Sequence, residues 1–164
     1  MNYNFDGKSL TIFFAPEGFN EFLKDHNITK EEFNLPVVVS GTCTDCLNLF
    51  KNCTHFNMPV ELQDGIINCN SMFANCTEFN QPIKIPDSVR DCSYMFYKMF
   101  ADCFSFNQPV DIPSSVTDCK LMLAWCSSFN QPLGSYDIPE YHDILFGNSK
   151  SVSKLNDCEE TSHF

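Results

Sequence analysis

FNQPIKIPDSVRDC, residues 79–92, is the stretch that decides the fold, because parts of it return along the chain. The motif Phe-Asn-Gln-Pro occurs at 79–82, 106–109 and 129–132, and a variant with methionine in the third place occurs at 56–59. The four phenylalanines that open these copies are 23, 27 and 23 residues apart. Such a period is typical of a repeat protein, in which one structural unit is stacked several times.

Cysteines recur together with the motif. One lies three residues before each phenylalanine: Cys53, Cys76, Cys103 and Cys126. In three copies a second cysteine lies seven residues earlier: Cys46, Cys69 and Cys119. The long step is explained by an insertion of four residues, because Cys92 and Cys103 are eleven apart, and 97–100 fits the extra length. Four residues is close to one helical turn, so we expect the insertion to lengthen a helix without rotating its apolar face.

A unit of about 23 residues is too short to close a core of its own, and it must bury its apolar face against the next unit. Residues 82–86 and 109–113 alternate apolar and other side chains between prolines, which predicts short strands in a parallel sheet. Residues 88–103 place apolar side chains three and four apart, which predicts a short helix. In three units an aspartate lies just before the cysteine that opens this segment, and we expect it to cap the helix: Asp45, Asp91 and Asp118. The predicted fold class is therefore an α/β solenoid, with a short parallel sheet on one face, short helices on the other and a cap at each end.

These residues carry a family resemblance. The run Ile-Pro-x-Ser-Val-x-x-Cys-x-x-Met-Phe-x-x-Cys-x-x-Phe resembles the Treponema-type (bacterial surface antigen) leucine-rich repeat. The run Met-Phe-x-x-Cys-x-x-Phe-Asn-Gln-Pro is similar to the related repeat of mycoplasma lipoproteins. Together the two resemblances cover roughly residues 43 to 139. They imply a curved leucine-rich repeat solenoid that binds other macromolecules, most often proteins, and they bring no catalytic residues with them.

The predicted organisation has three parts. Residues 1–42 lack the repeat and form an N-terminal cap, with a strand at 9–14, a helix from Pro16 to Asn27, a Thr-x-x-Glu capping box at 29–32, and a first sheet strand at 35–39. Residues 43–139 hold four repeat units. Residues 140–164 form a C-terminal cap followed by a polar, flexible tail.

The ten cysteines admit four interpretations, which are disulfides, reduced ladders, a zinc site and a redox site. Equivalent cysteines of stacked strands lie about one strand spacing apart, close enough for disulfides. We favour reduced cysteine ladders, because the chain shows no secretion signal and free cysteine packs as a small hydrophobe. Cys43-x-x-Cys46 is an isolated pair without a second pair at zinc-site spacing, so a metal site and a redox site stay as alternatives behind the reduced ladders.

Enzymatic chemistry is not expected either. The four histidines lie in different units, and the chain has no glycine-rich phosphate loop, nucleophile elbow or His-Glu-x-x-His motif. No catalytic residue and no cofactor is therefore predicted.

The strand face is the predicted protein-binding surface. On each short strand one residue between buried aliphatics should point outward, and the glutamine of each Phe-Asn-Gln-Pro copy lies near a strand start; the candidates are Glu61, Lys84, Asp111, Gln81, Gln108 and Gln131. For the motif asparagines we favour a structural role over ligand contact, with side chains bonding the backbone of neighbouring units. This predicted ladder contains Asn57, Asn80, Asn107 and Asn130.

The net charge of −11 bears on the partner. Phosphates and anionic membranes should repel the chain, whereas a basic protein should attract it. We expect an intracellular, cytoplasmic protein of a bacterium or of a phage-infected host, because no signal segment and no apolar run of membrane-spanning length is present.

Three functions from different classes follow. The first is a non-enzymatic module that binds a protein. The second is a small acidic, phage-type inhibitor, a counter-defence protein or nucleic-acid mimic, that acts on a basic nucleic-acid-handling enzyme such as a CRISPR effector. The third is a thiol or metal-binding protein. An open end of the stack could also pair with another copy of the chain, so a homodimer is among the partners considered.

Overall fold

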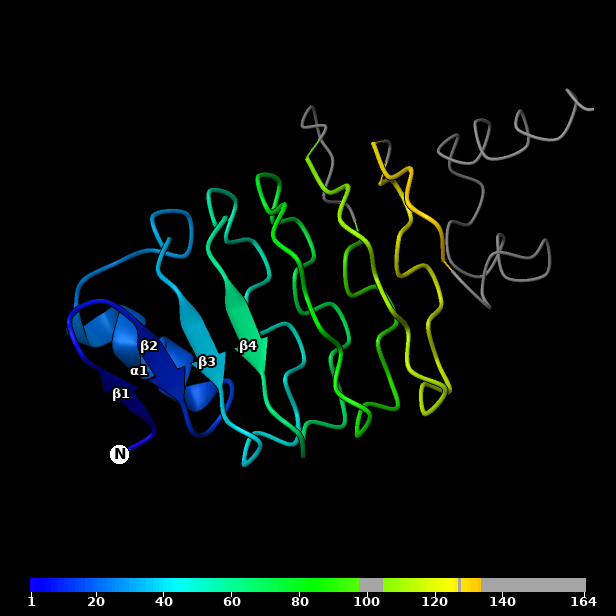
Figure 1. Ribbon diagram of the computed structural model, residues 1–164. Coiled ribbons are helices and arrows are strands. Elements are labelled where there is room, and N and C mark those ends of the chain that lie inside the picture. The colour runs from blue at the N-terminus through cyan, green and yellow to red at the C-terminus, as the bar shows by residue number, and fades with distance from the viewer. Residues whose placement is uncertain (98–104, 127, 134–164) are drawn as a thin grey trace, which may run out of the picture.

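The computed structural model describes residues 1–97, 105–126 and 128–133. The regular elements follow in the order β1 (Tyr3–Phe5), β2 (Leu10–Ile12), α1 (Glu17–Asp25), β3 (Val37–Val39) and β4 (Val60–Leu62). The strands form one mixed sheet in the order β1-β2-β3-β4; β1 is antiparallel to β2, and the other two pairs are parallel. After β4 the chain continues in successive turns that lie side by side (Figure 1). Each such turn, one sequence repeat long, is called a coil below.

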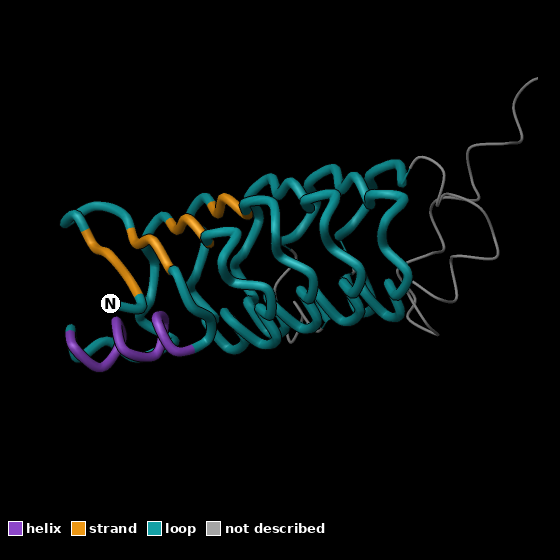
Figure 2. The backbone as a smooth tube through the Cα atoms, turned by 90° about the horizontal axis from the view of Figure 1, so that it is seen from below, coloured by secondary structure: helices purple, strands orange, loops and turns teal. Residues whose placement is uncertain are grey.

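The N-terminal elements agree with the sequence. The helix predicted from Pro16 to Asn27 is observed as α1, and it buries Phe19, Phe22 and Leu23 as expected for its apolar face. The strands predicted within 9–14 and 35–39 are observed as β2 and β3. In Figure 2, α1 lies below the strands, in line with the turn segments of the later coils. The helix thus takes the place that those segments occupy further along the stack.

The capping box at 29–32 is confirmed. The backbone N–H and Oγ1 of Thr29 donate to Glu32 Oε2 at 3.0 and 2.9 Å, and the Glu32 N–H donates back to Thr29 Oγ1 at 3.3 Å. These hydrogen bonds to the carboxylate hold the pKa of Glu32 below its ordinary value. The box fixes the chain direction between α1 and β3.

Two predicted strands are not formed as strands: 82–86 and 109–113. At the end of β4, the Gln63 N–H donates to the Val39 carbonyl at 3.1 Å. Pro86 and Pro113 occupy the equivalent positions in the next two coils and have no N–H to donate. The side chains nevertheless keep the strand alternation, since Lys84 is exposed between two buried isoleucines. The pleated face therefore continues after the hydrogen-bonded ladder ends.

The helix predicted at 88–103 is wrong in its described part, 88–97, which is a series of turns. In these turns, alternate backbone N–H groups donate to carbonyl groups of the next coil, and they are not used for hydrogen bonds within a helix. The Phe73 N–H donates to the Met95 carbonyl at 2.9 Å, and the Phe96 N–H to the Met122 carbonyl at 3.0 Å. An α-helix would need every one of these donors for bonds four residues back. Positive φ angles recur in the turn segments, at Asn48, Asn52, Ser71, Asn75, Tyr94, Leu121 and Trp125.

The aspartates expected to cap helices cap turns instead. The Oδ1 atoms of Asp45, Asp91 and Asp118 accept the backbone N–H two residues further on, at 3.0, 2.8 and 3.0 Å. This is the Asx-turn bond, in which a short carboxylate replaces a backbone acceptor. With Asn68 these residues form a column of parallel bridges from coil to coil.

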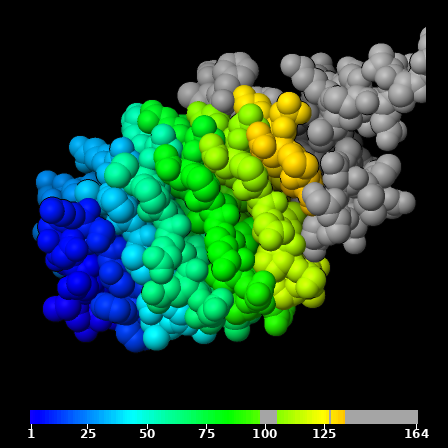
Figure 3. All heavy atoms as spheres, viewed as in Figure 1, coloured from blue at the N-terminus to red at the C-terminus, as the bar shows by residue number. Residues whose placement is uncertain are grey.

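The core contains two columns of stacked phenylalanine rings. One column contains Phe33, Phe56, Phe79, Phe106 and Phe129, with 5.3–6.3 Å between successive ring centroids. The other contains Phe50, Phe73 and Phe96, with spacings of 5.5 and 5.7 Å. The described coils pack directly on one another along the stack (Figure 3). Burying aromatic rings of this size contributes strongly to the packing between coils.

The four-residue insertion leaves this core unchanged. The centroid distance between Phe96 and Phe106, which flank the insertion, is 4.5 Å, against 4.4 Å between Phe73 and Phe79 in the preceding coil. The insertion itself lies mostly outside the described residues, as does the predicted C-terminal cap at 140–164. Within the described part of the chain, no helix has the length and apolar character needed to cross a bilayer.

Candidate protein-binding surface

Three charged side chains form a row on the outer face of β4 and of the equivalent extended segments in the next two coils. Glu61, Lys84 and Asp111, called the outward row below, are all exposed, and each stands between two buried aliphatic residues. Glu61 pairs in register with Val38 on β3, so the row continues the outer face of the sheet. The structure therefore places these predicted residues on one surface.

A shallow hollow lies beside the outward row. It is lined by Glu61, Leu62, Gln63, Asp64, Lys84 and Pro86. Within the described residues, Lys84 forms no ion pair with a carboxylate closer than 4.0 Å. A lysine left unpaired beside acidic side chains can contact a carboxylate of a partner, while its neighbours contact a cation.

The motif asparagines form a ladder through the stack. The Asn57 Oδ1 accepts the Asn80 N–H at 2.9 Å, the Asn80 Oδ1 accepts the Asn107 N–H at 2.9 Å, and the Asn107 Oδ1 accepts the Asn130 N–H at 2.8 Å. Asn34, which the sequence analysis did not include, begins the ladder by accepting the Asn57 N–H at 3.0 Å. Their side chains satisfy backbone donors of the next coil, as the structural interpretation predicted.

The three motif glutamines belong to the same network. The Nε2 atoms of Gln81, Gln108 and Gln131 donate to the ladder asparagine of the preceding coil at 3.1, 3.2 and 3.1 Å. All three side chains are half-buried. These glutamines were predicted to contact a partner, but the donors of their amide groups are turned into the scaffold. The charged outward row is the better candidate surface.

The eight described cysteines are free and buried. Cys53, Cys76 and Cys126 lie in the core as predicted, and the fourth member of that ladder, Cys103, lies outside the described residues. The Cys76 Sγ donates to the Phe50 carbonyl at 3.0 Å. Burial raises the pKa of Cys53 and Cys69 to about 12. These thiols are therefore protonated at neutral pH, whereas the thiolate is the form that attacks an electrophile.

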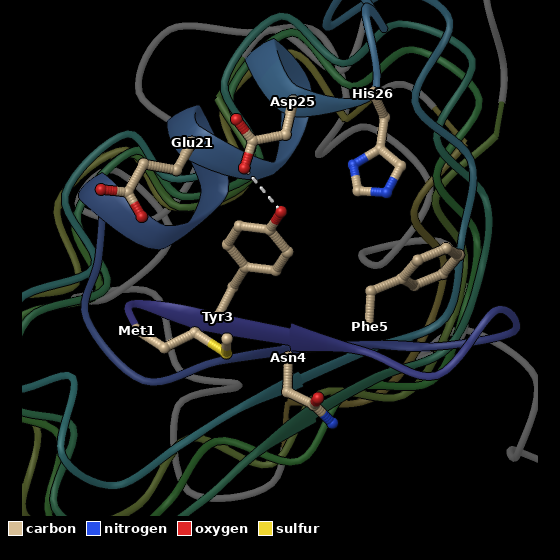
Figure 4. A pocket seen from close by; sticks show the side chains of 7 residues that line it. All are labelled: Met1, Tyr3, Asn4, Phe5, Glu21, Asp25 and His26. Carbon is tan, nitrogen blue, oxygen red and sulfur yellow. Dashed lines mark hydrogen bonds between the residues drawn. The ribbon is translucent and has the colours of Figure 1, made fainter.

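A second hollow lies at the N-terminal end, between β1 and α1. It is called the edge hollow below and is lined by Met1, Tyr3, Asn4, Phe5, Glu21, Asp25 and His26 (Figure 4). Sequence reasoning missed this hollow because it did not predict β1. Alternation of Tyr3 and Phe5 with polar residues was the available signal, but a strand of three residues is too short for such a pattern to stand out.

A family model described as "Mycoplasma protein of unknown function, DUF285" matches residues 19–112 and again residues 44–157. The chain belongs to this family. No curated protein and no solved structure matches it. The predicted likeness to mycoplasma repeats is thus confirmed at the level of the family, whereas the likeness to the Treponema-type repeat stays a prediction.

The DUF285 match also starts before the predicted first repeat unit at residue 43. Phe33-Asn34-Leu35-Pro36 is a further copy of the motif, and Phe33 stands 23 residues before Phe56. Its ring packs on Phe56 at 5.3 Å. This copy was missed because leucine replaces glutamine at the third position of the motif, although the spacing of 23 residues from Phe56 was sufficient to find it.

Proposed function

We propose that this DUF285 chain is a non-enzymatic leucine-rich repeat solenoid that binds a protein partner through the outward row. Coil after coil carries the same aliphatic, asparagine and phenylalanine positions, which supports the solenoid. The outward row supports the binding role, because it presents charged side chains on a scaffold that hydrogen bonds and ring stacking hold in place.

One observation carries the proposal: the residue at the position of Glu61 changes in charge from coil to coil, while the residues on either side of it stay aliphatic. Glu61, Lys84 and Asp111 are exposed, whereas the residues on either side of each are buried Val, Leu or Ile in every coil. A scaffold that keeps its core and varies its surface can be fitted to one partner without loss of stability. Repeat proteins use their extended sheet faces in this way.

The partner that fits this face is a protein with both basic and acidic side chains. The outward row offers two carboxylates around one ammonium group, and the chain as a whole carries a charge of −11. The overall field should draw a basic protein to the surface, and the pattern of the row should set the register of the complex.

The test compares two triple variants of the full chain as bait for partners from a cell lysate. Glu61→Ala/Lys84→Ala/Asp111→Ala removes the outward row. Glu31→Ala/Glu78→Ala/Lys120→Ala removes the same charges from exposed positions outside the row and serves as the matched control. Both variants should melt as the unchanged chain does, since surface changes of this kind cost little. We expect the control to retain a specific partner and the row variant to lose it. Equal recovery by both variants would show that the row is not the binding surface.

The second candidate, an acidic inhibitor of a nucleic-acid-handling enzyme, rests on the net charge of −11. Binding by charge alone should weaken steeply as salt is added, because screening shortens the range of the field. A partner held equally well at about 0.5 M salt, where the Debye length is only a few ångströms, would exclude this second function.

A further inference from the structure

Among the described residues, no strand covers the outer edge of the sheet at β1. The strand order ends at β1, which pairs with β2 alone among the described residues. The Asp6 N–H donates to the Ser9 carbonyl at 3.4 Å, and the Phe13 N–H donates to the Asn2 carbonyl at 2.9 Å. The backbone N–H and C=O groups of the even-numbered residues in segment 2–6 therefore point toward β2. Since bonding directions alternate along a strand, the N–H and C=O groups of Tyr3 and Phe5 point away from the sheet.

The edge hollow lies between β1 and α1, and the three residues of this edge strand, Tyr3, Asn4 and Phe5, all line it (Figure 4). Its floor is aromatic. The rings of Tyr3 and Phe5 pack edge-on against the buried ring of Phe22, at 5.5 and 5.2 Å between centroids, and His26 packs against Phe5 at 5.3 Å. Aromatic rings arranged around a hollow attract a cation through their quadrupoles.

Two carboxylates stand at the wall that α1 contributes. Asp25 accepts the hydroxyl of Tyr3 at 2.7 Å, and Glu21 accepts the amide of Asn2 at 2.7 Å. Each carboxylate is thus held in place by a neutral donor. Neither forms an ion pair closer than 4.0 Å with a basic side chain of the described residues. The helix also ends at Asp25, so the negative end of its dipole adds to the field in the hollow.

We propose that the β1 edge and the edge hollow together bind an extended peptide segment by strand addition, with a lysine or arginine side chain of that segment seated against Glu21 and Asp25. Main-chain bonds to Tyr3 and Phe5 supply affinity that is independent of sequence, and the hollow supplies the preference for a cation. The short edge limits the contact to a few residues, so the interaction is weak by itself and adds to binding elsewhere on the chain.

This site lies apart from the outward row and does not depend on its function. Glu61 stands on β4, with two strands between it and β1. The two sites can therefore be tested separately.

The experiment uses the full chain, labelled with ¹⁵N, and the peptide acetyl-Thr-Val-Lys-Val-Thr-amide at up to millimolar concentration. We expect the amide resonances of Tyr3 and Phe5 to shift downfield and their hydrogen exchange to slow as bonds form. A peptide with Glu in place of Lys should bind at least several-fold more weakly. Asp25→Asn and Glu21→Gln should each weaken the lysine peptide about two- to fivefold, the effect of one exposed ion pair. Glu78→Gln, which removes an exposed carboxylate outside both the edge hollow and the outward row, is the matched control and should leave the affinity unchanged.

The main-chain part of the proposal has a test of its own. Two peptides carry the same side chains, but one is N-methylated at its odd-numbered residues and the other at its even-numbered residues. Each peptide therefore keeps free N–H groups along only one of its two edges. Strand addition predicts that one of them binds and the other does not. Equal binding of both forms, no change at Tyr3 and Phe5, or no preference for Lys over Glu would each overturn the proposal.

Discussion

The side-chain oxygen of Asn57 accepts the backbone N–H of Asn80 at 2.9 Å, one coil further along the chain. The same atom accepts the side-chain amide of Gln81 at 3.1 Å, so two donors of the next coil meet one acceptor. A short amide side chain thereby fixes the register between coils at a point where no strand ladder reaches. The Phe-Asn-Gln-Pro motif returns along the chain because each copy holds the next one in place.

Asn80→Ala should lower the free energy of unfolding by about 1–3 kcal/mol. The change leaves the half-buried Asn107 N–H, which now donates to Asn80 Oδ1 at 2.9 Å, without its acceptor. Urea unfolding followed by circular dichroism measures the loss. Asn80→Asp keeps the acceptor oxygen and is the matched control, which should lose clearly less stability. Equal losses for the two variants would mean that this hydrogen bond does not matter.

Gly65→Ala should destabilise the fold more than Gly7→Ala. Both glycines have positive φ, +112° at Gly65 and +89° at Gly7, so either substitution costs about 1–3 kcal/mol in backbone strain. A methyl group at Gly65 would also collide with the backbone carbonyl of Gly41 in the preceding coil, whereas at Gly7 it meets open space. The difference in stability between the two variants, measured by thermal unfolding, gives the cost of the collision. A smaller loss at Gly65 than at Gly7 would contradict this packing.

The repeat could be predicted from the sequence because its determinants are local and periodic. Phe79, Asn80 and Pro82 recur in copy after copy, and each has one geometric role that repetition makes visible. The burial of the phenylalanines and the asparagine ladder followed from that pattern, and the structure shows both. The outward position of Glu61 followed from strand alternation alone.

The turn segments could not be predicted by the same reasoning. Apolar residues three and four apart fit a helix, and Met95, Phe96 and Cys92 are indeed buried together. What decides against the helix is hydrogen bonding to the next coil, which spacing within one unit does not reveal. The asparagines at 48, 52 and 75 were the available signal, because asparagine tolerates positive φ better than other residues with a side chain.

The buried cysteines should resist alkylation in the folded chain. The pKa of Cys53 is raised from 9.0 to about 12 by burial, which lowers its thiolate population about a thousandfold at neutral pH. Cys69 has the same raised pKa for the same reason. Iodoacetamide labelling, read at each cysteine by mass spectrometry, should show slow reaction of both in buffer and fast reaction in urea. Fast labelling of either thiol in buffer would place it at the surface, contrary to its burial in the core.

Asp25→Asn should lower the pKa of Tyr3. The hydrogen bond from the Tyr3 hydroxyl to Asp25 is the main cause that raises this pKa, and burial and the negative charge of Asp25 add to it. A group whose pKa is raised by folding stabilises the fold fully below its unfolded pKa, about 10 for tyrosine, and the contribution is lost as pH rises through the folded pKa. The unchanged chain should therefore lose stability at alkaline pH, in part through Tyr3.

The Asp25→Asn variant can keep the hydrogen bond through its amide oxygen but not the charge, so the Tyr3 pKa should move toward its ordinary value. The loss of stability at alkaline pH should then be smaller. Titration of the Tyr3 ¹³Cζ resonance between about pH 8 and 12, a range that brackets the ordinary tyrosine pKa, measures the shift directly. Glu78→Gln, which removes an equal charge from an exposed position in another coil, is the control and should leave the Tyr3 titration unchanged. If the Tyr3 titration is the same in Asp25→Asn as in the unchanged chain, the contact between β1 and α1 does not hold in solution, and the wall of the edge hollow is not formed as described.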